Sequence, residues 1–231
     1  AGLFSYNGVL LGLLLSLYFP WSALLPPLII AAGGLSAMFV QQWLKRVRLS
    51  QYLPAYTAPF VILGWLLLCF ATPSSNAHLI EISPQNILAA PLKGLGQVMF
   101  LGHPLAGAMI AAGLLIADRR AFCWAMLASV AGMGWSMLHH DFYSALIGLG
   151  GYNAVLAALA CHSLHQKPWL PLLGIAFALI LTPAFAAIGL PTLTAPFILA
   201  CWLIRTVVQM LGKAAVAHTP CALEENQPRL R

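Results

Sequence analysis

The sequence predicts an all-α integral membrane protein, and three observations carry this prediction. First, 61% of the 231 residues are hydrophobic and only 7% are charged, whereas about a quarter of the residues in soluble domains are charged. Second, the apolar residues form long runs of helical length. Third, a pair of short signatures occurs twice, in the same order each time. Together these features indicate a duplicated transmembrane protein.

Apolar runs of about the length needed to cross a bilayer core, roughly 20 residues, recur along the chain. We count eight candidate spans, at Leu3–Phe19, Ala23–Leu44, Pro54–Ala71, Pro104–Ala117, Ala121–Leu138, Phe142–Cys161, Pro168–Ala187 and Pro191–Val208. The least hydrophobic stretch, between the third and fourth spans, is followed by the short amphipathic segment Lys93–Leu101. We expect this segment to be a re-entrant helix, which is stable at membrane depth only where protein or water covers its ends.

The duplication consists of two signatures. The segment Gly2–Leu10 (GLFSYNGVL) returns as Gly148–Leu156 (GLGGYNAVL), and Leu53–Phe60 (LPAYTAPF) returns as Leu190–Phe197 (LPTLTAPF). Apolar segments interrupted by proline at matching positions of two repeats are typical of transporters and channels whose site lies between the halves.

The basic residues predict the orientation of the repeats. If the chain crosses the membrane at each span, one side receives Lys45, Arg46, Arg48, Arg119, Arg120, Lys167, Arg205, Lys213, Arg229 and Arg231, and only Lys93 lies on the other. The side rich in lysine and arginine is expected to be cytoplasmic. The two L-P-x-x-T-A-P-F segments then enter from opposite sides, so the repeats are predicted to be inverted. Because this pattern explains the net charge of +6, we expect no nucleic-acid partner.

The first repeat is shorter than the second. Gln97 lies 51 residues before the second Gly-x-x-x-Tyr-Asn signature (148 − 97), whereas the first signature begins at Gly2. We therefore expect that about fifty residues of repeat one are missing from this chain.

The doubled L-P-x-x-T-x-P-F motif, each copy preceded by Gly-Leu-x-x-Tyr-Asn, resembles the urea transporter family of bacteria and animals, up to about Lys213. The resemblance implies two inverted repeats of about five transmembrane helices each plus a re-entrant helix, assembled as a homotrimer with one pore per protomer. Residues 1–71 would be the C-terminal part of repeat one with three spans. Residues 72–91 would form a polar periplasmic loop, 92–212 repeat two, and 213–231 a cytoplasmic tail.

The resemblance also implies a narrow filter of aromatic rings, leucines, threonines and a polar residue on the re-entrant helix. Matched by motif, the substrate-binding residues are Thr57 and Thr194, Tyr6 and Tyr152, Leu10 and Leu156, with Gln97 and Phe100 on the re-entrant helix. A single membrane threonine usually bonds the carbonyl three or four residues back, but recurrence in a doubled motif favours the filter. For Asn7 and Asn153 we expect a structural role, bonding neighbouring backbone.

The chemistry of such a filter can be stated without the family. Urea offers four N–H donors and one carbonyl, and it loses hydrogen bonds worth several kcal/mol if it enters an apolar constriction alone. Threonine hydroxyls and the Gln97 carbonyl can replace the lost water. Gln97 and Phe100, at i and i+3, are expected to project from one helical face. Helices that start at the repeated prolines are expected to leave free N–H groups facing the pore, which disfavours cations.

Other motifs carry no function in this interpretation. His139-His140-Asp141 and His162-x-x-His165 fall at span ends and in a basic loop, so we predict no metal, and the scattered cysteines predict no disulfide. We find no cofactor or nucleophile motif and expect no enzyme. All five acidic residues lie at span edges or in tails, and coupled transport usually needs an ionisable residue within the membrane.

The sequence therefore predicts passive, channel-like transport of urea in the cell inner membrane, with membrane lipid around the protein. Two alternatives remain open at this stage. One is a channel for another small polar solute, such as ammonia or a short amide, and the other is a non-conducting truncated membrane protein.

Overall fold

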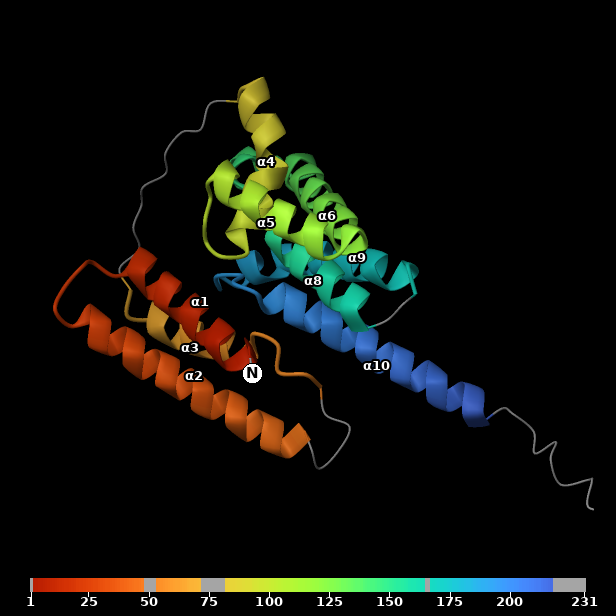
Figure 1. The fold of residues 1–231 in the computed structure, drawn as a ribbon, viewed down its shortest axis with the longest axis horizontal. Coiled ribbons are helices and arrows are strands. Elements are labelled where there is room, and N and C mark those ends of the chain that lie inside the picture. Colours follow the sequence, from red (N-terminus) through yellow and green to blue (C-terminus); the bar gives the residue numbers. More distant parts are fainter. Residues whose placement is uncertain (1, 48–52, 72–81, 165–166, 218–231) are drawn as a thin grey trace, which may run out of the picture.

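The computed structural model describes residues 2–47, 53–71, 82–164 and 167–217, and these residues contain helices and no strand (Figure 1). The helices are α1 (Gly2–Tyr18), α2 (Leu25–Val47), α3 (Ala58–Leu68), α4 (Pro84–Gln97), α5 (Pro104–Ala117), α6 (Arg119–Leu138), α7 (Phe142–Ile147), α8 (Tyr152–Leu164), α9 (Trp169–Ala187) and α10 (Ala195–Ala217). The all-α class is confirmed.

Three helices are long and apolar enough to cross a membrane: Leu25–Arg46 of α2, Arg119–Leu138 of α6 and Trp169–Ala187 of α9. The other five predicted spans correspond to the shorter apolar helices α1, α3, α5 and α8 and to the apolar part Ala195–Leu211 of α10. Large apolar side chains such as Ile30, Leu105 and Ile116 are exposed along these helices. A chain of this kind is a membrane protein, because these faces need lipid rather than water.

The predicted span Phe142–Cys161 is wrong as a single helix. The structure breaks it into α7 and α8 around Gly148–Gly151. Gly148 has φ 84°, and a Cβ built on it would lie 2.3 Å from the backbone nitrogen of Gly94. Since α4 approaches this turn backbone to backbone, only glycine fits, and the left-handed conformation ends the helix.

The boundary between the polar loop and the re-entrant segment also differs from the prediction. We expected loop through Pro91, but α4 already begins at Pro84, where the Ser83 hydroxyl accepts a hydrogen bond from the backbone N–H of Asn86. Pro91, the last residue of the predicted loop, lies inside the helix, and its carbonyl accepts from the Ser129 hydroxyl of α6 at 2.7 Å. Residues 72–81 of the predicted loop lie outside the described residues.

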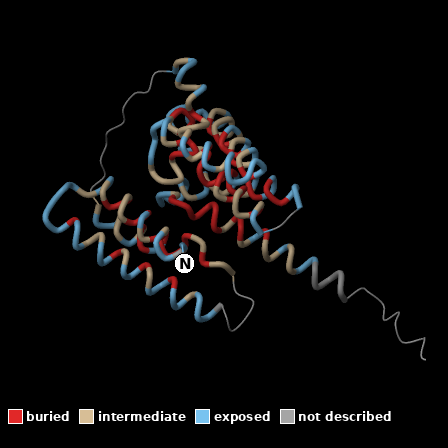
Figure 2. The backbone as a smooth tube through the Cα atoms, viewed as in Figure 1, coloured by how far each residue is buried: buried red, intermediate tan, exposed pale blue. Residues whose placement is uncertain are grey.

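The helices form two groups that meet at the repeated loops (Figure 1). Helices α1, α2 and α3 pack on one another, α4 to α9 form the larger group, and α10 runs beside α8 and α9 while also contacting α3. Buried positions lie where helices face one another, and the outer faces of α1 and α2 are largely exposed (Figure 2). The contact between α3 and α10 thus places the two copies of the L-P-x-x-T-A-P-F segment in one core.

Candidate functional site

Thr57 and Thr194, the two repeated threonines, face each other in this core. Their Oγ1 atoms lie 2.7 Å apart and share a hydrogen bond in which either hydroxyl can donate. Each residue is only 3% exposed. Thr57 immediately precedes α3 and Thr194 immediately precedes α10. The hydroxyls are therefore bonded to each other rather than to the carbonyls of a preceding helical turn.

The loops that carry the two threonines have the same backbone shape. Tyr56 and Leu193, one residue before each threonine, have φ values of 42° and 39°. This left-handed conformation is uncommon outside glycine and costs about 1–3 kcal/mol per residue. The surrounding hydrogen bonds must therefore hold each loop in place.

Asn7 of α1 holds the first loop. Its Nδ2 donates to the carbonyl of Tyr56 at 3.1 Å, and its Oδ1 accepts from the backbone N–H of Phe60 at 3.1 Å. The side chain is fully buried. One amide thus fixes both the strained loop residue and the first turn of α3.

Asn153 of α8 makes the same contacts in the second loop. Its Nδ2 donates to the carbonyl of Leu193 at 3.0 Å, and its Oδ1 accepts from the backbone N–H of Phe197 at 3.4 Å. The expected structural role is therefore observed for both asparagines, although the bonded backbone is the distant repeated loop and not the neighbouring chain.

These contacts correct one expectation about the helix starts. The first-turn N–H groups of α3 are bonded: Ala58 donates to Ala55 at 2.9 Å, Pro59 has no N–H, Phe60 donates to Asn7, and Val61 donates to Thr57 at 3.0 Å. Residues 195–198 of α10 follow the same pattern. Free N–H groups do not face the space between the loops, and only the helix dipoles remain to act there.

Two tryptophans cross between the repeats. The indole N–H of Trp65 donates to the carbonyl of Pro191 at 2.8 Å, and the indole N–H of Trp202 donates to the carbonyl of Pro54 at 2.9 Å. Each repeat therefore holds the proline of the other repeat's loop.

The two tyrosines predicted for the filter differ in their contacts. The hydroxyl of Tyr152 donates to the carbonyl of Leu193 and lies 3.2 Å from the Thr192 hydroxyl. Tyr6 is half-buried and packs against the core. Sequence reasoning missed Thr192, because the matching position of the first repeat is Ala55, so comparison of the motifs gave no signal.

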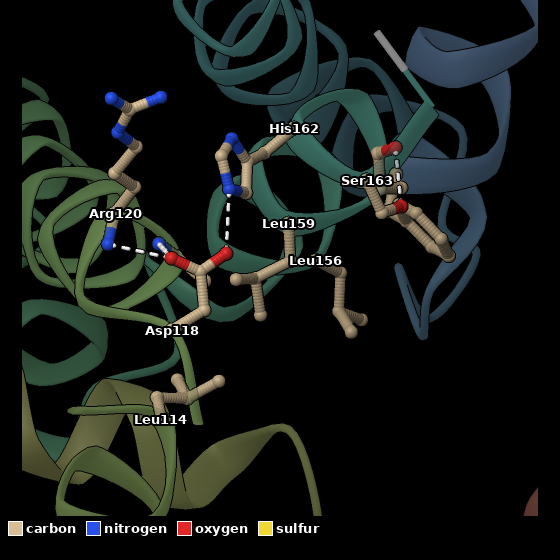
Figure 3. A pocket seen from close by; sticks show the side chains of 10 residues that line it. Leu114, Asp118, Arg120, Leu156, Leu159, His162 and Ser163 are labelled. Atoms are coloured by element: carbon tan, nitrogen blue, oxygen red, sulfur yellow. Dashed lines mark hydrogen bonds and ion pairs between the residues drawn. The ribbon is translucent and has the colours of Figure 1, made fainter. Parts of the chain in front are cut away.

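The two predicted leucines are also unequal. Leu10 is fully buried. Leu156 is half-buried and lines a cavity of about 950 Å³ together with Phe197, Leu114, Asp118 and His162 (Figure 3). Leu156 therefore borders open space, whereas Leu10 is enclosed by the core.

Asp118 and His162 form an ion pair at the rim of this cavity, with 2.9 Å between Oδ2 and Nε2 (Figure 3). The hydrogen bond from His162, followed by those from the backbone N–H groups of Ala121 and Arg120, lowers the pKa of the Asp118 carboxyl. Sequence reasoning placed both residues at span ends but gave no signal that they meet.

Gln97 and Phe100 do not share a helical face, which corrects that prediction. Helix α4 ends at Gln97, and Phe100 lies beyond it with φ 58°. The Gln97 Nε2 donates to the carbonyl of Ile147 at 3.0 Å, whereas the Phe100 ring meets the Phe60 ring edge-on at 6.0 Å. The polar residue thus contacts α7 and the aromatic residue contacts α3.

The histidines considered for metal binding have other contacts. The His139 ring packs edge-on against Trp135 at 4.8 Å, and Asp141 accepts from the backbone N–H of Ser144. Within the part of the chain that the structure describes, three or more metal-binding side chains do not gather at any point. His165 lies outside the described residues.

Comparison with known proteins agrees with the motifs. The chain matches the family described as Urea transporter over residues 1–209. It is 26% identical over 233 aligned residues to Urea transporter 1 of Ovis aries and to that of Capra hircus, and 28% identical over 239 residues to Urea transporter 1 of Rattus norvegicus. Each alignment covers 87% of this chain and 59% of the relative. The chain therefore spans about three fifths of the length of these curated relatives, and it belongs to the urea transporter family.

Proposed function

We propose that this protein provides a passive, channel-like path for urea across the membrane, with the Thr57–Thr194 pair at its narrowest point. The observation that carries the proposal is the buried 2.7 Å contact between these two hydroxyls. Family membership supports urea as the permeating molecule, since the relatives in sheep, goat and rat are all named urea transporters.

The hydroxyl pair suits a neutral polar solute. Without urea each threonine satisfies the other, so neither is a buried polar group lacking a partner. When urea enters, each hydroxyl oxygen can accept one urea N–H in place of its partner threonine. This exchange offsets part of the several kcal/mol that urea loses on leaving water.

We assign supporting roles to the other predicted residues. Tyr6, Tyr152 and Phe100 provide flat apolar faces that admit a planar molecule, and Leu156 lines the space on the way to the threonines. Gln97 donates to the Ile147 carbonyl, which fixes the orientation of its amide, and its Oε1 is the acceptor that we assign to urea. Leu10 is buried, and we assign it to holding α1 in place.

The matched contacts of the two loops support an inverted repeat as the basis of the path. Asn7 and Asn153 bond equivalent atoms, and Trp65 and Trp202 exchange equivalent partners. We infer that the repeats enter from opposite sides, with the start of α6 (Arg119 and Arg120) and the end of α10 (Lys213) facing the cytoplasm. We further propose the cell inner membrane as the location and a homotrimer with one path per protomer.

We infer transport without ion coupling. Among the described residues, the amide and hydroxyl side chains that are buried belong to Asn7, Ser36, Thr57, Ser129, Ser136, Asn153 and Thr194. None of these is ionisable, while Arg205 is half-buried. Coupled transporters usually hold an ionisable residue at membrane depth.

Stopped-flow measurement of urea flux into proteoliposomes containing the full-length protein tests the proposal. We expect urea to equilibrate at a rate independent of sodium and proton gradients. Accumulation above equilibrium under either gradient would rule out a passive path, and flux equal to that of empty liposomes would rule out urea as the permeating molecule.

A further inference from the structure

A second cavity, of about 550 Å³, lies between the start of α6, the end of α8 and the start of α9. Its lining includes three cationic side chains, Arg119, Arg120 and Lys167, together with His162, Trp124 and Cys123. No acidic residue lines this cavity among those described. The cavity is therefore strongly positive.

The nearest carboxylate does not neutralise the arginine side chains. Asp118 accepts from the backbone N–H groups of Arg120 and Ala121 at 2.8 and 3.3 Å and pairs with His162 at 2.9 Å. Arg119 and Arg120 are also the first two residues of α6, and Lys167 precedes α9, so these charges lie near the positive ends of two helix dipoles. An anion in the cavity would reduce the repulsion between the positive side chains and would interact favourably with the positive ends of the two helices.

Exposed apolar surface continues from the cavity along both helices. On α6, Cys123 is followed on the same face by Leu127 and Val130, which are 47% and 45% exposed. On α9, Trp169, Leu172 and Ile180 are 44%, 50% and 57% exposed. A free anion would leave these apolar side chains uncovered, whereas the acyl chains of a phospholipid would cover them.

We propose that this cavity binds the phosphate headgroup of an anionic phospholipid, with the acyl chains lying along the exposed faces of α6 and α9. Basic cavities between transmembrane helices on the cytoplasmic side bind anionic headgroups in this way. Trp124 also lines the cavity, and tryptophan is enriched at the interface between headgroups and acyl chains. The site is separate from the threonine pair and does not depend on which solute the protein carries.

Cys123 offers a direct readout, because it is exposed and lines the cavity, and Cys69, the residue directly after α3, is an exposed internal control. The rate of alkylation of each thiol by N-ethylmaleimide is measured by peptide mass spectrometry in the full-length protein, in nanodiscs of phosphatidylcholine with and without phosphatidylglycerol. We expect phosphatidylglycerol to slow alkylation of Cys123 severalfold and to leave Cys69 unchanged.

The variant Arg119→Gln/Lys167→Gln removes two of the positive charges. Since each lysine or arginine near a membrane surface contributes about fivefold to the binding of anionic lipid, native mass spectrometry should show the preference for phosphatidylglycerol over phosphatidylcholine falling by about twentyfold or more. The matched control is Lys45→Gln/Arg46→Gln, which removes two basic residues from the last turn of α2. It should keep the preference and the protection of Cys123.

Three outcomes would overturn the proposal. One is equal protection of Cys123 by phosphatidylcholine, which would indicate nonspecific covering by lipid. Another is equal loss of the preference in both double variants, which would indicate general surface charge. The third is that inorganic phosphate at millimolar concentration protects Cys123 as well as phosphatidylglycerol does, which would indicate a site for the free anion.

Discussion

The indole N–H of Trp65 donates to the carbonyl oxygen of Pro191 at 2.8 Å, although 126 residues separate the two in the chain. Trp202 returns the contact by donating to Pro54 at 2.9 Å. Each tryptophan lies six residues after the second proline of its own signature, Trp65 after Pro59 and Trp202 after Pro196. The loops that carry the threonines are therefore fixed by the opposite repeat.

Replacing Trp65 by Phe should lower the stability of the protein. The ring is largely kept, but the hydrogen bond to the Pro191 carbonyl is lost, which costs about 0.5–1.5 kcal/mol. We expect a lower Tm for Trp65→Phe and a similar decrease for Trp202→Phe, measured by thermal unfolding in detergent. Trp135→Phe is the matched control, because the Trp135 Nε1 is buried with no hydrogen-bond partner. A decrease in Tm of equal size in the control would show that ring packing, and not the hydrogen bond, is responsible.

Replacing Gly148 by Ala should disrupt the contact between α4 and the turn that joins α7 and α8. The backbone has φ 84°, and the added Cβ would lie 2.3 Å from the Gly94 nitrogen, so neither the conformation nor the space suits alanine. We expect a large fall in the yield of folded protein, measured by fluorescence-detected size exclusion. Gly113→Ala in α5, where nothing lies within 4 Å of the new Cβ, should be neutral or stabilising by about 0.5–1 kcal/mol. Normal yield of Gly148→Ala would contradict the observed close approach.

How far the sequence predicted the structure depends on how local each feature is. Thr57 and Thr194 could be paired from the sequence, because both stand at the same position of a doubled motif. The break at Gly148 could not be predicted, because it depends on the approach of Gly94, 54 residues earlier. The composition of an apolar segment gives no information about which distant backbone packs against it. The start of α4 was missed for a related reason: Pro91 reads as a helix breaker, and its accommodation beside Ser129 is a tertiary effect.

The Gln97 and Phe100 side chains show the limit of periodicity. Their spacing fits one helical face only if the helix continues, and α4 ends at Gln97. The positive φ of Phe100 then turns its ring toward Phe60. The Asp118–His162 pair is a similar case, because its two residues come from segments that only the packing of α6 on α8 brings together.

The stability of the protein should depend on pH through Asp118 at the start of α6, because the pKa of this carboxyl is lowered. A carboxyl whose pKa is lowered in the folded protein stabilises it above the ordinary aspartate pKa of about 4 and loses this effect as the pH falls through the lowered value. We therefore expect the Tm of the wild type to fall more steeply between about pH 5 and pH 3 than that of Asp118→Asn. Parallel Tm curves for the two proteins over this range would contradict the contribution of this carboxylate.

The Thr194 hydroxyl should matter for flux and much less for folding. Thr194→Val keeps the shape of the side chain but removes an acceptor, so that urea leaves one N–H unsatisfied at the narrowest point, at a cost of about 1–3 kcal/mol. Added to the barrier for permeation, this lowers flux by about fivefold to more than a hundredfold. Thr57→Val should have an effect of similar size, because the two hydroxyls are equivalent partners in one hydrogen bond.

Thr194→Ser is the matched control, since serine keeps the hydroxyl and loses only a methyl group. Thr192→Val is not a suitable control, because the Thr192 hydroxyl lies 3.2 Å from that of Tyr152. Urea flux is compared in proteoliposomes at equal protein density, with each variant checked for an unchanged elution profile. Flux near the wild-type value in Thr194→Ser and strongly reduced in Thr194→Val would assign the effect to the hydroxyl. Equal flux in the two variants would mean that the threonine pair holds the two repeats together and that urea passes elsewhere.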